Sequence, residues 1–396
     1  MKFAIGVLLA TGIQLAAAPI DHTVEDWNRE FREAVRRQTP PPCLVARNLA
    51  ILHLAMWRAS EASSPENRSA AIAASAHEVS VTLFPGDRAK FDRLLTSSPD
   101  APPEVVKRSR SLAQSEVNRR KDDGSTTTVH YQPDLEVGIW QRTTNNREPE
   151  LPHWSHVRPF LLESAAEFRP PPPPEIGTES YHQDLAEVAR LGGRNSRVRT
   201  KDQAESAFFW SDFSYTDSPP GRWNEIACQA LEDRDMSIAE KARLFAILNL
   251  ALADAGIAAW DCKFHYKFWR PVSAIRESMD DGDPDTVPNP NWKSLLPAPS
   301  HPEYVSGHST FSGAGACVLS HFLGELPAPI SIETREMPGV RRKFENFDDI
   351  ANEIGRSRIY GGIHFESANC EGLKLGAKVA RHTITRFEAS FEPAEP

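Results

Sequence analysis

The sequence has no run of basic residues, although it contains 45 lysines and arginines. Acidic residues outnumber them, and the formal net charge is −9 at pH 7. Nucleic acids and anionic membrane surfaces both attract proteins through clustered positive charge. The composition therefore indicates neither as the main partner, and a site for an anion would have to be local.

Closely spaced cysteines are also lacking. The five cysteines are scattered at positions 43, 228, 262, 317 and 370, with no C-x-x-C pair. Structural zinc sites and redox dithiols depend on such pairs, so the pattern indicates neither. Most of the five lie in apolar helical patterns, where a buried free thiol is the simpler interpretation and no disulfide is predicted.

Beyond the N-terminal segment, long apolar runs are absent. No later segment reaches the roughly 20 apolar residues of a membrane helix. The first residues differ. Met1-Lys2, the apolar stretch Phe3 to Leu15 and Ala16 to Ala18 follow the order of a secretory signal peptide. We predict a signal peptide at residues 1–18, export to the periplasm or the extracellular space, and no stable membrane insertion.

Helical patterns fill most of the remaining 396-residue chain. They run from about residue 24 to 120 and from about 181 to 387, within one predicted domain over 19–396. Ala46 to Ala59 and Ala242 to Ala255 are identical at eight of fourteen positions. Such an echo indicates a duplicated unit. We predict an all-α fold of two related helical bundles packed together.

The connection between the two halves, residues 125–177, is rich in proline and ends in the run Pro170 to Pro174. Proline lacks the backbone N–H that a helix interior needs. The segment also contains aromatic residues such as Trp154, which a free linker seldom has. We predict that it wraps a bundle surface or lines the mouth of a pocket. A second break in the helical pattern is predicted at Ser218 to Gly221.

Three short motifs in the C-terminal half combine fixed positive charge with histidine or glycine. They are Lys263 to Pro271, Ser306 to His308, and Ser357 to His364. Arginine and lysine pair with oxyanion oxygens, and neutral imidazole can move a proton at physiological pH. The three motifs together predict a pocket for one tetrahedral oxyanion.

Lys263 and Arg270 are seven residues apart, which is two turns of a helix. We therefore expect both side chains to project from one helix face toward a single ligand. Pro271 favours a helix boundary at Arg270. Taken alone, the pair is better explained as two solvated cations on a surface helix, which is what most Lys/Arg pairs are.

The second motif lies where a loop enters a helix-compatible run. Free N–H groups at a helix start attract anions, and Gly307 allows the backbone to come close. Ser306 could serve as a plain N-cap, whereas His308 adds an acid–base group that a cap does not need. In the third motif, the Gly361-Gly362 pair can turn Arg358 and His364 toward one point.

At these residues the chain resembles the superfamily of vanadium-dependent haloperoxidases and type 2 phosphatidic acid phosphatases. The superfamily pattern is K-x6-R-P, then P-S-G-H, then S-R-x5-H-x3-D. The resemblance covers about Trp260 to Gly372 and is greatest to exported bacterial haloperoxidase relatives. Val305 replaces the usual proline, and Ala368 stands where the family has an aspartate that holds the histidine ring. Glu366, Asn369 or a backbone carbonyl would then have to orient His364.

The resemblance implies a haloperoxidase whose cofactor is vanadate and whose partners are hydrogen peroxide, a halide and a small organic acceptor. It implies His364 as the vanadium ligand and His308 and Lys263 as catalytic residues beside it. The implied oxyanion-binding residues are Lys263, Arg270, Ser306, Gly307, Arg358 and His364.

His301 and Trp260 resemble residues near the halide site, where a histidine is associated with bromide enzymes. Bromide or iodide is therefore expected in preference to chloride. A loop histidine beside a proline and a core tryptophan are equally simple interpretations of these two residues.

The same motifs leave two other functions open. An exported acid phosphatase would bind phosphate in the same pocket and form a phosphohistidine at His364, with His308 protonating the leaving group. A helical protein that only binds an oxyanion would explain why the family aspartate is missing at Ala368.

Overall fold

The computed structural model describes residues 21–143, 147–213, 215–232, 234–277 and 288–391. The predicted signal peptide at residues 1–18 lies outside these ranges. Helices dominate the described part, so the predicted all-α class is confirmed. A short antiparallel hairpin, which the sequence patterns did not predict, joins two of the C-terminal helices.

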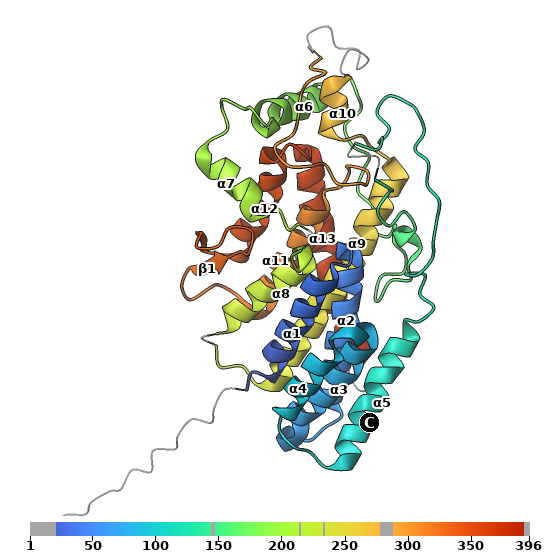
Figure 1. The fold of residues 1–396 in the computed structure, drawn as a ribbon, viewed down its shortest axis with the longest axis vertical. Coiled ribbons are helices and arrows are strands. Elements are labelled where there is room, and N and C mark those ends of the chain that lie inside the picture. The colour runs from blue at the N-terminus through green and yellow to red at the C-terminus, as the bar shows by residue number, and fades with distance from the viewer. Residues whose placement is uncertain (1–20, 144–146, 214, 233, 278–287, 392–396) are drawn as a thin grey trace, which may run out of the picture.

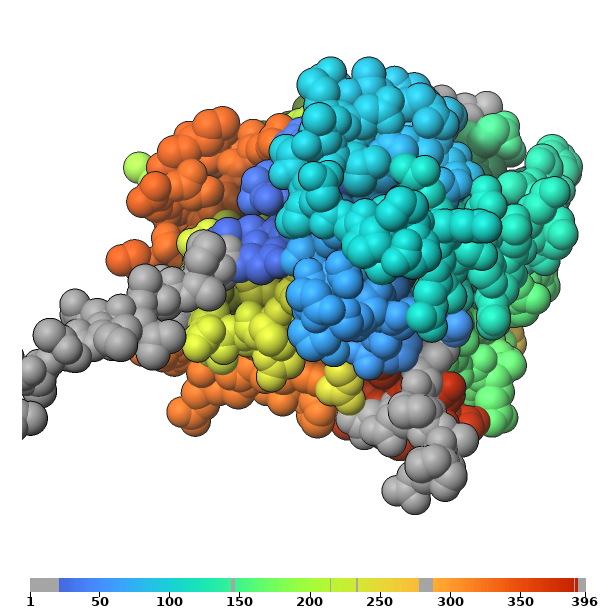
Figure 2. Space-filling view, turned by 90° about the horizontal axis from the view of Figure 1, so that it is seen from below, coloured from blue at the N-terminus to red at the C-terminus, as the bar shows by residue number. Residues whose placement is uncertain are grey.

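The N-terminal half consists of five helices and two short 3-10 turns, which form the lower part of the view in Figure 1 and the end of the molecule seen from below in Figure 2. They are α1 (Thr23–Gln38), α2 (Pro42–Glu61), η1 (Pro65–Asn67), α3 (Arg68–Leu83), η2 (Pro85–Asp87), α4 (Arg88–Thr96) and α5 (Pro103–Arg119).

The remaining elements follow the proline-rich connection. They are η3 (Trp154–His156), α6 (Glu179–Gly192), α7 (Lys201–Phe209), α8 (Ser218–Leu231), α9 (Ile238–Tyr266), α10 (Pro271–Arg276), α11 (Gly307–Leu323), β1 (Ile330–Glu333), β2 (Arg341–Phe344), α12 (Phe347–Tyr360) and α13 (Glu366–Phe391).

Helix α9 is the central element, because it packs against α2 on one side and against α11 and α13 on the other. It begins at a capping box in which Ser237 and Glu240 satisfy each other's backbone N–H groups. By length and composition alone it could cross a membrane, which is contrary to the sequence prediction. Its most apolar window is nevertheless 94% buried inside the protein. The apolar run is therefore explained by the core.

The two echoing sequence segments lie on α2 and α9, and these helices contact each other. At their interface the His53 ring stacks on the Phe245 ring, with centroids 5.1 Å apart. Helices α11 and α13 also contact α9, and α12 packs against both of them (Figure 1). The repeat thus contributes the two helices along which the halves join.

The proline-rich connection wraps the surface of α9, as predicted. Buried Asp254 of α9 accepts hydrogen bonds from the backbone N–H groups of residues 160, 161 and 162 at 2.7, 2.8 and 3.0 Å. The hydroxyl of Tyr266 donates to the Pro170 carbonyl at 2.6 Å. These bonds satisfy an irregular backbone that has no helical partners of its own.

The predicted break at Ser218 to Gly221 is wrong, because these residues form the first turn of α8. Two prolines stand at the start of that helix. Proline fits there because the first N–H groups of a helix have no intrahelical acceptor and its φ angle is already helical.

Helices α11 and α13 approach each other through glycine. A Cβ atom added to Gly313 of α11 would lie 2.1 Å from the carbonyl oxygen of Leu373 on α13. A Cβ added to Gly376 of α13 would lie 2.0 Å from the carbonyl oxygen of Thr310. The close approach brings the N-terminus of α11 and the start of α13 together, and each follows one of the sequence motifs.

We predict that Gly313→Ala lowers the free energy of unfolding by about 1–3 kcal/mol, because the added methyl group must push α13 away from α11. Urea denaturation followed by circular dichroism measures the change. Gly86→Ala is the matched control, since the nearest atom to its added Cβ is 3.7 Å away. Equal stability of the two variants would contradict the close packing.

Candidate functional site

The expected placement of Lys263 and Arg270 on one helix is wrong. Helix α9 ends at Tyr266, Lys267 adopts a left-handed conformation with φ 51°, and Arg270 is the extended residue before α10. Pro271 excludes the helical conformation at Arg270, as the X-Pro rule requires. The two side chains still converge, because Lys263 Nζ and Arg270 Nη2 lie 3.1 and 3.5 Å from the same Pro302 carbonyl oxygen.

Lys263 is fully buried and directs its ammonium group at the loop before α11. Nζ donates to the carbonyls of Pro302 and Glu303 at 3.1 and 3.0 Å and also to that of Val305. Burial and the nearby Arg270 hold the pKa of Lys263 well below its ordinary value. Three carbonyls nevertheless accept from Nζ, and only the charged ammonium has three N–H groups to donate. Lys263 therefore fastens this loop.

Arg270 connects the first motif to both histidine-bearing segments. Its Nε donates to the His301 carbonyl at 3.0 Å, and Nη2 lies 2.9 Å from His301 Nδ1. Nη1 donates to the Ile363 carbonyl at 2.8 Å and lies 3.1 Å from His364 Nε2. Burial lowers the pKa of Arg270 to about 10, so the guanidinium stays charged.

The protonation of the His364 ring follows from its two neighbours. Arginine has no acceptor, so Nε2 must accept the Arg270 N–H and carry the lone pair. Nδ1 lies 2.7 Å from Oε1 of Glu303 and is left to donate to it. Burial, and next the charge of Arg270, hold the pKa of His364 well below its ordinary value. The ring is neutral with the proton on Nδ1, which leaves Nε2 as a ligand atom.

None of the groups considered for orienting His364 contacts its ring. Glu366 pairs with Arg356 at 2.6 Å, and Asn369 accepts from the Ser309 hydroxyl at 2.8 Å. The orienting group is Glu303, a fully buried residue of the loop before α11. The prediction is corrected because the carboxylate comes from a segment that is remote from His364 in sequence.

The second motif forms the predicted helix N-terminus. Ser306 is the N-cap of α11, and its hydroxyl oxygen accepts from Ser309 N at 3.3 Å. Its own backbone N–H donates to the Ala368 carbonyl at 3.0 Å, which joins the second and third motifs. Gly307 follows, and its open side faces the cavity described below. Ser306 therefore serves as the N-cap of α11, one of the two roles that the sequence left open for it.

His308 projects from the first turn of α11 and is one-fifth exposed (20%). Its Nε2 lies 3.7 Å from Oδ2 of Asp212 and has no hydrogen-bond partner within the described residues. Burial and the charge of Arg358 hold the pKa of His308 well below its ordinary value. A neutral imidazole with an unengaged nitrogen is suited to receive a proton.

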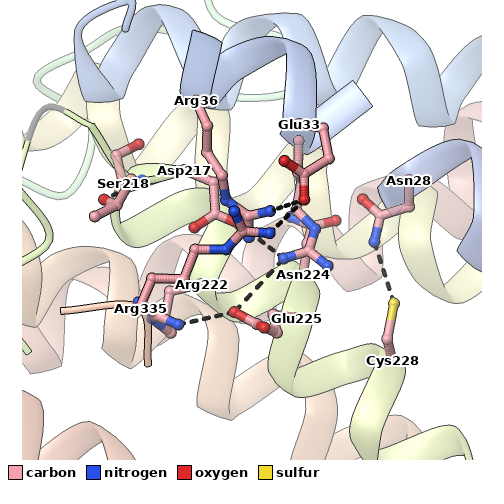
Figure 3. A network of polar contacts seen from close by, with 12 residues as sticks. Asn28, Glu33, Arg36, Asp217, Ser218, Arg222, Asn224, Glu225, Cys228 and Arg335 are labelled. Atoms are coloured by element: carbon pink, nitrogen blue, oxygen red, sulfur yellow. Dashed lines mark hydrogen bonds and ion pairs between the residues drawn. The ribbon is translucent and has the colours of Figure 1, made fainter. Parts of the chain in front are cut away.

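Asp212 belongs to a buried polar network that the motifs did not reveal. Arg222 Nη2 lies 3.3 Å from Asp212 Oδ1 and pairs with Glu336 at 3.1 Å. The network continues from Arg222 through Glu225 and Arg32 to Asp217, which also pairs with Arg36 of α1 (Figure 3). Burial raises the pKa of Asp212 to about 7, although Arg222 opposes the shift. Its backbone φ of 43° is rare for a residue with a side chain.

Arg358 lies in the last turn of α12 and is buried. Nη2 donates to the Ala207 carbonyl at 3.1 Å, and Nε to the Ser357 hydroxyl at 2.9 Å. Burial lowers the pKa of Arg358 to about 10. Its guanidinium borders the same cavity as His308, so the second and third motifs meet there.

A cavity of about 380 Å³ lies beside these groups. Five of the predicted site residues line it, namely Trp260, His301, Gly307, His308 and Arg358. The other four are buried and are not among the residues that line the cavity, namely Lys263, Arg270, Ser306 and His364. The bonds from Arg270 to His301 and His364 connect the two groups.

The predicted halide-site residues are neighbours in the cavity wall. The rings of Trp260 and His301 have centroids 5.0 Å apart, and Trp260 Nε1 donates to the Glu150 carbonyl at 3.1 Å. Much of the remaining wall is proline, with phenylalanine and leucine. These residues are Pro40, Pro41, Pro42, Pro219, Pro297, Pro299, Phe213, Phe311 and Leu296.

The site has an excess of buried positive charge. Lys263, Arg270 and Arg358 are all at most 1% exposed. Burial raises the pKa of three carboxylates that interact with these cations: to about 8 for Glu303, to about 7 for Asp212, and above its ordinary value for Glu150 in the cavity wall. They therefore do not neutralise the cations fully. An oxyanion would balance that charge. His308, whose Nε2 has no hydrogen-bond partner among the described residues, lines the same cavity. The residues fit such a ligand.

The sequence analysis did not identify two functional candidates, Glu303 and Asp212. Glu303 stands two residues before the second motif, yet nothing in its local pattern distinguishes it from a loop residue. Asp212 comes from the segment between α7 and α8, which carries no motif. Among the described residues, no group of three or more histidine, cysteine, aspartate or glutamate side chains could hold a metal ion.

Comparison with known proteins identifies relatives of this site. A family model described as VCPO second helical-bundle domain matches residues 243–393. The chain is 30% identical over 269 residues to a vanadium chloroperoxidase of Curvularia inaequalis, which covers 58% of this chain and 42% of that protein. It is 30% identical over 125 residues to a vanadium-dependent bromoperoxidase of Corallina pilulifera, covering 28% of this chain and 20% of that protein. The chain thus spans less than half the length of these curated relatives.

Solved structures show the same fold over almost the whole chain. A bacterial vanadium-dependent iodoperoxidase superposes with a TM-score of 0.79 at 25% identity, over 93% of this chain and 97% of that one. A bacterial vanadium-dependent chloroperoxidase superposes with a TM-score of 0.70 at 18% identity, over 88% and 92%. The resemblance in the motifs is confirmed, whereas the roles of the individual site residues stay predictions.

We predict that Arg358→Met weakens binding of inorganic phosphate or vanadate about 10–100-fold, the loss expected for one charged hydrogen bond in a buried site. Isothermal titration calorimetry measures the affinity. Arg341→Met is the control, because Arg341 lies on β2 and pairs there with Glu333. Unchanged affinity in Arg358→Met would remove Arg358 from the oxyanion site.

Proposed function

Because the chain is a relative of the vanadium-dependent haloperoxidases, we propose that it oxidises a halide with hydrogen peroxide at a vanadate ligated by His364. The observation that carries the proposal is the His364 ring, whose Nδ1 donates to Glu303 and whose Nε2 carries a lone pair beside Arg270. Vanadium needs one neutral imidazole, and this arrangement supplies it.

The other oxyanion-binding groups act through charge and through N–H donors. Arg270 and Arg358 would pair with vanadate oxygens, and the N-terminus of α11 at Ser306 and Gly307 would add backbone donors. For His364 to act as the ligand, Nε2 must exchange the Arg270 N–H for the oxyanion. Lys263 would support oxyanion binding indirectly, because its ammonium group holds the backbone of residues 302–305 in place.

Bound vanadate would supply a Lewis acid that activates hydrogen peroxide, and the vanadium would keep its oxidation state. His308 would take up or deliver the proton at Nε2. Asp212, 3.7 Å from that nitrogen, would stabilise the charged imidazole when the proton is there.

Iodide and bromide are proposed in preference to chloride. His301 in the cavity wall and the similarity to a bacterial iodoperoxidase support this preference. The cavity of about 380 Å³, with its proline-rich wall, is large enough for a small organic acceptor. Export is part of the proposal and is supported by the pattern of residues 1–18.

An assay of the purified protein tests the function. With vanadate, hydrogen peroxide and a phenol reporter, we expect halogenation with iodide and bromide that disappears when vanadate is removed. His364→Ala should retain no vanadate and show no turnover. Hydrolysis of p-nitrophenyl phosphate that vanadate inhibits would instead make the protein a phosphatase, and neither activity would leave an oxyanion-binding protein.

We predict that His308→Ala keeps its affinity for vanadate within a few-fold but lowers kcat about 100–10,000-fold, the usual contribution of a general acid or base. Calorimetry and steady-state kinetics on the same preparation separate the two effects. His321→Ala is the control, because this histidine lies at the far end of α11, away from the cavity. Weaker vanadate binding with an unchanged kcat would make His308 a binding residue.

A further inference from the structure

We propose that Glu303 positions His364 for its role as a ligand, and replaces from another chain segment the aspartate that the family has at the position of Ala368. The proposal rests on the proposed function, since it concerns the same imidazole. It makes Glu303 a positioning residue, because it touches neither the oxyanion nor a substrate.

Glu303 holds His364 at two points. Its Oε1 accepts from His364 Nδ1 at 2.7 Å and from the backbone N–H of Phe365 at 2.9 Å. One carboxylate oxygen thus fixes the ring and the backbone next to it. Both residues are at most 2% exposed, so solvent does not compete for these bonds.

The bond to Glu303 decides which nitrogen of His364 is available to a ligand. Moving the proton from Nδ1 to Nε2 would break the bond to Glu303 and would set an Nε2–H group against the N–H of Arg270. The lone pair is therefore kept on Nε2, the nitrogen that faces Arg270. A carboxylate on the opposite nitrogen also makes a ligating imidazole more basic, as it does in other metal sites.

The residues around Ala368 cannot do the same work. Ala368 has no polar side-chain atom, and its carbonyl accepts from Ser306 N. Glu366 is engaged with Arg356, and Asn369 with Ser309. Among the described residues, the carboxylate that contacts the His364 ring is that of Glu303.

The position of Glu303 depends in turn on Lys263. The ammonium of Lys263 donates to the backbone carbonyl of Glu303 at 3.0 Å and to its neighbour Pro302 at 3.1 Å. Arg270 Nε binds the His301 carbonyl in the same loop at 3.0 Å. The two cations of the first motif thus hold the loop that delivers the carboxylate to the third motif.

Two variants test the proposal on the full chain. Glu303→Met keeps the length of the side chain but removes both acceptors. Glu303→Gln keeps an acceptor and removes the charge that the carboxylate carries above its pKa of about 8, so affinities are compared above that pH. The matched control is Glu366→Gln, which removes a nearby carboxylate that pairs with Arg356 instead. Circular dichroism checks that each variant is folded.

The first readout is the His364 tautomer in the anion-free protein, measured by ¹⁵N NMR on histidine-labelled samples and assigned with His364→Ala. We expect Nδ1–H in the wild type, in Glu303→Gln and in the control. In Glu303→Met we expect a mixture of the two tautomers, because only the Arg270 N–H at Nε2 still favours Nδ1–H. The second readout is vanadate affinity by calorimetry. We expect it to fall about 10–100-fold in both Glu303 variants, as for other partners of ligating histidines, and to stay unchanged in the control.

Wild-type vanadate affinity in Glu303→Gln would overturn the proposal, as would an unchanged tautomer in a folded Glu303→Met. If Glu303→Met does not fold, the affinity of Glu303→Gln decides. The proposed function fails separately, if the wild-type protein binds vanadate with a protonated His364 Nδ1 but oxidises no halide.

Discussion

Buried positive charge beside the start of α11 is the constraint on which the rest of the site depends. Lys263, Arg270 and Arg358 are withdrawn from water, and removing an isolated charge from water is strongly unfavourable. Backbone carbonyls accept N–H groups from each of the three, which helps to solvate the cations without neutralising them. A site that is solvated by dipoles and short of negative charge is suited to bind an oxyanion.

The helical framework serves this constraint by bringing three distant segments together. Helix α9 carries Lys263, and its neighbours α11 and α13 carry or follow the other two motifs. Their spacing is set by glycine at Gly313 and Gly376, so the loops between the helices have little freedom. The bond from Ser306 N to the Ala368 carbonyl then joins the second motif to the third.

The all-α class, the wrapping proline-rich segment and the helix N-terminus at Ser306 could be predicted because each depends on local sequence. Residue spacing also indicated the convergence of Lys263, Arg270 and His364, although not its geometry, since α9 ends at Tyr266, between the first two. Glu303 and Asp212 could not be predicted. Each acts across the fold, on His364 and His308 respectively, and a partner remote in sequence leaves no periodic or spaced signal.

The central claim is that Arg270, Arg358 and the neutral His364 surround a single oxyanion, with Lys263 holding the loop beside them. A crystal structure of the protein soaked with vanadate tests it most directly. The account predicts vanadium bonded to His364 Nε2, with Arg270 and Arg358 on its oxygens and His308 beside it. Vanadate bound elsewhere, for example in the groove that contains Lys374, Lys378 and Arg381 between α11 and α13, would contradict it.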